Sequence, residues 1–166
     1  ALDAARQLMP CPVVGMTEAA CLTACMLGGR FGMITFGGIE MYRELVARYG
    51  LEARLADIIA VKATPPEAVA DPTSVGTKVL AATQALAAEG ANSVVLAGAA
   101  LAGFDNRLQA AAPVPLLDGM ACGVRMAEML VALGLPKPDA GTYAHPAGRA
   151  AVGISSPLAA LLRGDG

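Results

Sequence analysis

The sequence predicts an α/β fold built on a parallel sheet. Short apolar runs rich in Val, Ile and Leu alternate along the chain with longer Ala-rich stretches of helical periodicity. The apolar runs are nearly continuous and do not alternate with polar residues, which is typical of parallel strands covered by helices on both faces. Glycines follow several of the helical stretches, as they do at helix C-termini.

Each element is bounded by recognisable signals. Strands are expected at residues 11–15, 31–36, 55–61, 93–97 and 114–117. Helices are expected at residues 1–9, 17–27, 39–49, 72–89, 106–112 and 120–133, with a last helical turn at 157–162. Thr17 suits the N-cap of the second helix, while Gly28, Gly50, Gly90 and Gly134 stand where helices should end.

A weak internal repeat points to two related halves. When Pro10 is placed on Pro113, the segments 10–14 and 113–117 align, and each is preceded and followed by a predicted helix. Two unrelated βα units of similar composition are the alternative. If the repeat is real, the helix at 1–9 should follow a strand that the sequence lacks. The first half is therefore expected to be incomplete at its N-terminus.

Composition and charge exclude several classes of partner. The net charge is −2 with no cluster of Lys or Arg, so nucleic acid and anionic membrane surfaces are not expected to bind. The longest charge-free stretch, residues 90–104, is shorter than the roughly 18–20 residues that a membrane span needs. The four cysteines form no CxxC pair and the chain has one histidine, His145, so no metal site is expected and a cytoplasmic protein with reduced thiols is predicted.

The loops at the carboxyl ends of the strands are the expected ligand site. In an open parallel sheet a ligand binds beyond these ends. Three of the loops also begin helices, whose N-terminal dipole favours an anion such as a carboxylate. The hydroxyls of Thr17 and Thr35 could hold carboxylate oxygens; the alternatives are a simple N-cap for Thr17 and an ordinary strand residue for Thr35.

Cys122 is the thiol of most interest. It lies in the first turn of the predicted helix 120–133, where the helix dipole can lower the pKa of a thiol. The alternative is burial as a small apolar side chain. The sequence contains no GxGxxG fingerprint, P-loop or GxSxG elbow, so it supports neither nucleotide binding nor serine hydrolase chemistry.

Five segments together resemble the aspartate/glutamate/hydantoin racemase superfamily, and its hydantoin and allantoin branch in particular. They are residues 12–20 (PVVGMTEAA), 30–35 (RFGMIT), 48–51 (RYGL), 94–98 (VVLAG) and 114–119 (VPLLDG), the last followed by RMAE at 125–128. The resemblance implies two parallel-sheet lobes related by a pseudo-twofold axis. The first lobe would comprise residues 1–28 and 112–166 and the second residues 29–111.

The resemblance also implies racemisation without a cofactor. In the family, a cysteine from each lobe faces the substrate Cα; one thiolate removes the proton and the other thiol returns it on the opposite face. The substrate would be a hydantoin, an amino acid or a small dicarboxylate. Residues expected to bind it are Thr17, Glu18, Thr35, Gly98, Ala99, Asp118 and Gly119.

The sequence departs from the family pattern at both thiols. The position of the first cysteine lies upstream of Ala1, and that of the second is occupied by Gly98. A mechanism with two thiols is therefore not assigned to these residues. Cys122 is named as the candidate catalytic thiol, at a helix position that the resemblance makes a poor substitute base. The alternatives are a related decarboxylase or cis–trans isomerase of a dicarboxylate, or a degenerate module that binds a small carboxylate. A homo-oligomer is expected, because an incomplete lobe would expose apolar surface.

Overall fold

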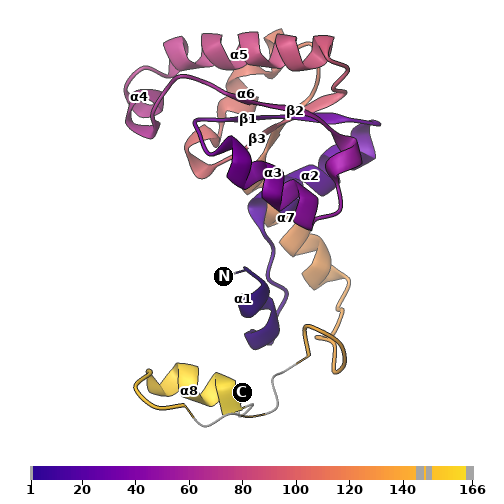
Figure 1. Ribbon diagram of the computed structural model, residues 1–166, viewed down its shortest axis with the longest axis vertical. Coiled ribbons are helices and arrows are strands. Elements are labelled where there is room, and N and C mark those ends of the chain that lie inside the picture. The colour runs from indigo at the N-terminus through magenta and orange to yellow at the C-terminus, as the bar shows by residue number, and fades with distance from the viewer. Residues whose placement is uncertain (1, 145–147, 149–150, 164–166) are drawn as a thin grey trace. The chain divides into compact units, whose positions relative to one another are not determined.

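The computed structural model describes residues 2–144, 148 and 151–163 (Figure 1). The chain divides into two compact units, one made of Ala1–Gly15 and Met126–Gly166 and the other of Met16–Arg125. The predicted α/β fold with a parallel sheet is confirmed. The pseudo-twofold relation and the lobe boundaries stay predictions.

The larger unit contains a four-stranded sheet with the strand order β2-β1-β3-β4, in which all neighbours are parallel. The strands are β1 (Phe31–Thr35), β2 (Leu55–Ala60), β3 (Ser93–Leu96) and β4 (Leu116–Asp118). Ile34 pairs with Leu96, and Leu96 pairs with Asp118, so the strand ends are in register. β4 therefore belongs to the same sheet as the strands of residues 29–111.

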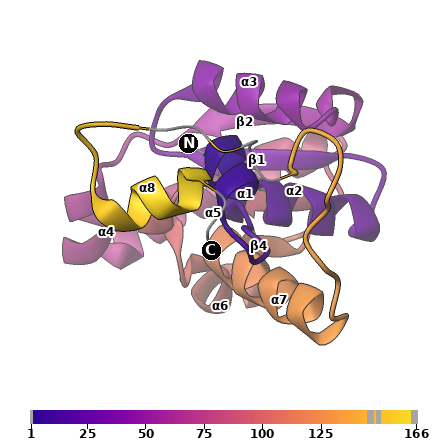
Figure 2. The ribbon, with the colours of Figure 1, turned by 90° about the horizontal axis from the view of Figure 1, so that it is seen from below.

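Helices cover both faces of this sheet. Those of the larger unit are α2 (Met16–Leu27), α3 (Ile39–Arg48), α4 (Pro65–Ala70), α5 (Pro72–Ala88), α6 (Phe104–Leu108) and the start of α7 (Gly119–Ala132). Short 3-10 turns lie at η1 (Glu52–Arg54), η2 (Ala99–Leu101) and η3 (Gln109–Ala111). Figure 1 shows α5 on one side of β1 and β3 and α2 and α3 on the other, and Figure 2 looks from the side of α2 and α3.

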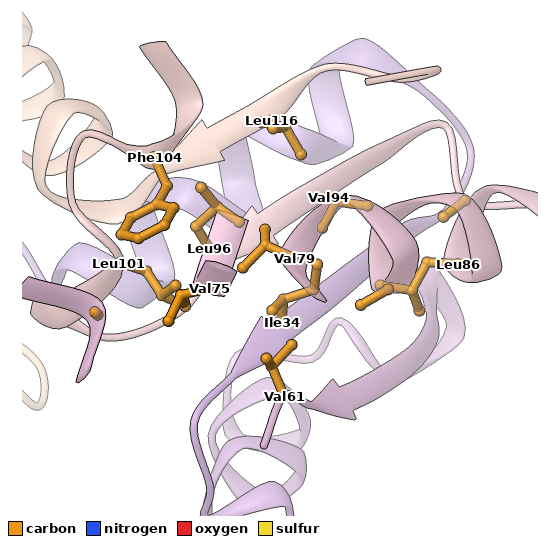
Figure 3. Packing of buried hydrophobic residues seen from close by; sticks show 13 residues of the cluster. Ile34, Val61, Val75, Val79, Leu86, Val94, Leu96, Leu101, Phe104 and Leu116 are labelled. Carbon is orange, nitrogen blue, oxygen red and sulfur yellow. The ribbon is translucent and has the colours of Figure 1, made fainter. Parts of the chain in front are cut away.

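The core follows from the alternation of side chains along each strand. Ile34, Val94 and Leu96 point toward Val79 and Leu86 of α5 (Figure 3). The intervening strand residues point the other way. They pack with the inner faces of α2 and α3 in a second cluster, whose buried members are Ala20, Cys21, Ala24, Phe31, Met33, Tyr42, Val46, Ile58, Val95 and Ala97. Both faces are buried, as the continuous apolar strands predicted.

Three local predictions were wrong. Residues 11–15 form no strand; Pro10 and Pro12 cannot donate ladder hydrogen bonds, and Cys11 is exposed. β4 begins at Leu116 and not at residue 114. α2 begins at Met16, so Thr17 lies inside the first turn and is not the N-cap.

A helix that was not predicted, α4, has a clear local cause. Thr64 and Glu67 form a capping box, in which the Thr64 hydroxyl accepts from the Glu67 N–H and the Glu67 carboxylate accepts from the Thr64 N–H. Two prolines follow Thr64 in the first turn, where a missing N–H costs nothing. Asp71 then caps α5 with a single bond, by accepting from the Ser74 N–H.

The smaller unit is built from short helices and connecting chain. It contains α1 (Leu2–Leu8), α8 (Ser156–Arg163) and the last turns of α7. Lys137 donates to the carbonyl of Arg6 at 2.7 Å, and the hydroxyl of Tyr143 donates to Asp3 at 3.0 Å. His145 lies outside the described residues. Within the described part of the chain, no helix is both long and apolar enough to cross a membrane.

Candidate functional site

The predicted site residues lie along the carboxyl edge of the sheet in the larger unit. The Ala97 N–H donates to the carbonyl of Ile34 at 2.8 Å, which places the ends of β3 and β1 side by side. A Cβ built on Gly119 would lie 3.4 Å from Cε of Met16, so the start of α2 meets the start of α7. The loops predicted from separate stretches of sequence therefore meet at one edge.

Gly98 follows β3 and adopts a backbone conformation that glycine tolerates. Its φ is +102° and its ψ is 141°, a region that side-chain-bearing residues rarely occupy. A Cβ at this position would lie 3.4 Å from the hydroxyl oxygen of Tyr42 on α3. Gly98 is half-buried, and Ala99, which begins η2, is exposed. The turn after β3 thus presents backbone and a neighbouring phenol instead of a side chain of its own.

Thr35 uses its hydroxyl within its own loop. The Oγ1 atom donates to the carbonyl of Gly37 at 2.7 Å and accepts from the Gly37 N–H at 3.2 Å. The side chain is almost fully buried, with 3% of its surface exposed. These bonds shape the turn between β1 and α3, and the hydroxyl proton is already committed to Gly37.

Asp118 at the end of β4 is also held by backbone groups. Its Oδ1 accepts from the N–H of Met120 at 2.7 Å and from that of Ala121 at 3.5 Å. Its Oδ2 accepts from the N–H of Gly103 at 2.9 Å. The carboxylate therefore caps the first turn of α7 and joins it to the loop before α6. Gly119, the next residue, is buried.

Cys122 does not have the lowered thiol pKa that its helix position suggested. Burial raises its pKa, and the negative charges of Asp118 and Asp105 act in the same direction, while a hydrogen bond from Thr23 opposes them. The half-buried side chain packs against the cluster under α2. At neutral pH Cys122 is therefore a protonated thiol. Burial also raises the pKa of the neighbouring Cys21, to about 12.

Two predicted residues begin α2. Thr17 and Glu18 lie in its first turn and are both half-buried. They follow Met16, whose side chain reaches Gly119. Their backbone positions therefore place them at the same edge as the ends of β1, β3 and β4.

Tyr42 is the residue of this edge that sequence reasoning missed. It lies four positions before Val46 on α3, so helical periodicity places the two on one buried face. That periodicity is typical of a core residue and gives no sign that the Tyr42 hydroxyl lies near Gly98. Among the described residues, no group of three or more His, Cys, Asp or Glu is arranged to hold a metal ion.

Comparisons with known proteins agree on one family. The model of the Asp/Glu/Hydantoin racemase family matches residues 1–127. A protein named hydantoin racemase from Rhizobium meliloti is 33% identical over 155 residues, which cover 92% of this chain and 64% of that protein. Another of the same name, from a Pseudomonas strain, is 32% identical over 156 residues, with coverage of 92% and 62%.

A solved structure is also similar. An allantoin racemase from Klebsiella pneumoniae aligns with a TM-score of 0.80 at 32% identity, over 96% of this chain and 65% of that one. The chain thus spans less than two thirds of the length of the relatives it matches.

Proposed function

The chain belongs to the Asp/Glu/hydantoin racemase family, and from that premise we propose that it acts in the racemisation of a hydantoin-like or amino-acid substrate. The reaction would be a proton transfer at the substrate Cα without a cofactor. Loss of that proton puts negative charge on the adjacent carbonyl oxygen, which must be stabilised by positioned donors.

The observation that carries this proposal is the convergence of loops at one edge of the sheet. Thr17 at the start of α2, the turn at Gly98 and Ala99, and the start of α7 at Gly119 all lie there. The positive end of the α2 dipole favours an anionic oxygen at this edge. In this proposal Thr17 and Glu18 contact the substrate, and Thr35 and Asp118 hold the shape of the loops that do so.

The raised pKa of Cys122 restricts the part that its thiol can play. A thiol that stays protonated at neutral pH can return a proton to the planar carbon, and it is a poor base for removing one. Within this proposal Cys122 can therefore return a proton, and removal of the Cα proton belongs to a group other than Cys122.

The test follows the optical activity and the Cα proton of one substrate. The chain is incubated in D2O with D- or L-5-benzylhydantoin, and circular dichroism and the C5–H proton signal are recorded. Faster decay of both signals than in protein-free buffer is the expected result, because racemisation exchanges that proton with solvent. Decay at the buffer rate for both enantiomers would remove the proposal.

A second candidate function is favoured by the backbone of Gly98. Gly98, with a φ of +102°, stands where the family resemblance places a thiol. Without that thiol, the edge suits a module that binds a small dicarboxylate, or a decarboxylase or isomerase that acts on a dicarboxylate. CO2 release, double-bond isomerisation and a raised melting temperature with a panel of dicarboxylates would distinguish these activities from racemisation.

The same proposal includes self-association. In the larger unit, large apolar side chains are exposed on α2 and on the first turns of α7, among them Leu22, Met26, Met120 and Val124. Exposed large apolar side chains are a feature of many protein–protein contacts. Sedimentation velocity at rising concentration is expected to show a species larger than a monomer, and a monomer at every concentration would contradict it.

A further inference from the structure

The polar side chains at the carboxyl edge differ in how much of their hydrogen-bonding capacity is already used by bonds within the protein. The Thr35 hydroxyl proton is donated to Gly37, and both oxygens of Asp118 accept backbone hydrogen bonds. The Tyr42 hydroxyl, by contrast, has no hydrogen-bond partner among the described residues. A phenol can both donate and accept a hydrogen bond, so this group keeps its full capacity for a ligand.

The ring of Tyr42 is fixed by the core. The side chain is 9% exposed and packs in the cluster that contains Val46, Ile58 and Ala97. A buried hydroxyl without a partner is costly. Among the described residues, the fully buried side-chain oxygens without a partner are Ser93 Oγ and Asp105 Oδ1. The Tyr42 oxygen is not one of them and so keeps some contact with solvent. The core thus holds the ring, and with it the hydroxyl beside Gly98, in one orientation.

Gly98 makes the space in front of that hydroxyl accessible. Its missing side chain would begin 3.4 Å from the phenol oxygen, and its φ of +102° disfavours any residue with a Cβ. A ligand atom that approaches the backbone after β3 therefore meets the Tyr42 hydroxyl at contact distance. Thr35 and Ala97, on adjacent strand ends, belong to the same edge.

We propose that Tyr42 is a ligand-contacting residue, whose hydroxyl donates a hydrogen bond to a carbonyl or carboxylate oxygen bound against Gly98. This assignment rests on the proposed function, because it uses the same edge and the same class of substrate. It adds a specific donor at this edge, because the Thr35 hydroxyl donates its proton to Gly37 and the Asp118 carboxylate only accepts hydrogen bonds.

The test is Tyr42→Phe, which removes the hydroxyl and leaves the buried ring. Tyr49→Phe is the matched control, because Tyr49 lies at the other end of the same helix and is half-buried. With 5-benzylhydantoin titrated by calorimetry, Tyr42→Phe is expected to raise the Kd about five- to tenfold, the effect of one lost hydrogen bond. Tyr49→Phe is expected to leave it unchanged.

A measurement on the unchanged chain does not depend on how the variants fold. With ¹³Cζ-labelled tyrosine, the Tyr42 signal is expected to shift when 5-benzylhydantoin is added, and the Tyr49 signal is expected to stay. If the parent chain binds and racemises the hydantoin and Tyr42→Phe has the same Kd, this inference is overturned and the proposed function is not. Absence of both binding and racemisation in the parent chain would overturn the proposed function, and this inference with it.

Discussion

Asp118 and Gly103, fifteen residues apart in the chain, are joined by a hydrogen bond of 2.9 Å from the Gly103 N–H to Oδ2 of the carboxylate. The other oxygen of the same carboxylate caps α7 through Met120. One side chain thus joins the end of β4, the loop before α6 and the first turn of α7. The positions of Gly119 and Cys122 depend on that link.

Asp118→Ala is therefore expected to destabilise the protein by about 1–3 kcal/mol, because it leaves an N-cap and a loop N–H without their acceptor. Asp118→Asn keeps one acceptor oxygen and should cost less. Urea denaturation measures both. Asp139→Ala, at an exposed position, is the control and should stay near the parent value. Equal stability of the Ala variant and the parent would contradict the capping role.

Gly98→Ala is expected to destabilise the protein by about 1–3 kcal/mol, since its backbone lies in a region where a Cβ is strained. Gly37→Ala is the matched control at the same edge, because its φ is not positive and nothing lies within 4 Å of the added Cβ. Thermal unfolding of the two variants compares them directly. A loss as large in Gly37→Ala as in Gly98→Ala would contradict the argument. Gly98→Cys should carry the same strain, so it would not simply supply a thiol.

Sequence reasoning predicted the regular elements because their causes are local. The glycines at 50, 90 and 134 follow helices and have positive φ, as expected of C-terminal caps. The strand predicted at 11–15 does not form, because Pro10 and Pro12 lack the N–H groups that a strand donates to its neighbour. The spacing of Thr64 and Glu67, three residues apart, is a local signal for the capping box that begins α4.

The site could be predicted only as a set of loops. The rule that parallel strands end at one edge brought Thr35, Gly98 and Asp118 together correctly. The sequence does not reveal which of their polar atoms already form hydrogen bonds within the protein. Those bonds join distant segments, such as the one from the Gly103 N–H to Asp118. The helix position of Cys122 suggested a lowered pKa, and burial against α2, which the sequence does not reveal, raises it.

Arg54 is expected to stabilise the C-terminus of α2. Its guanidinium donates to the carbonyl oxygens of Cys25 and Gly28 at 2.9 and 2.6 Å, and to that of Gly29 at 2.5 Å. Removing these charge-assisted bonds in Arg54→Ala should cost about 1.5–3 kcal/mol in urea denaturation, because the last carbonyls of a helix have no partner within it.

A second arginine provides the control for Arg54. Arg43 pairs with Asp57 at 2.7 Å with both side chains largely exposed, so Arg43→Ala should change stability by less than about 1 kcal/mol. If the two alanine variants lose equal stability, the role assigned to Arg54 is wrong. Arg54→Lys is expected to fall between them, since one ammonium cannot reach all three carbonyls.

The buried thiol of Cys21 predicts a loss of stability at alkaline pH. Burial raises its pKa from 9.0 to about 12 in the folded protein, whereas in the unfolded chain the thiol ionises near its ordinary value. Above pH 9 the unfolded state therefore binds fewer protons than the folded state, and stability falls as pH rises through the folded pKa. The contribution of this one group is about 1.4 kcal/mol per pH unit in that window.

Urea denaturation at pH 8 to 11 should show a steeper decline in stability for the parent than for Cys21→Ala. Cys11→Ala, which removes an exposed thiol, should follow the parent. Parallel declines for the parent and Cys21→Ala would contradict the raised pKa.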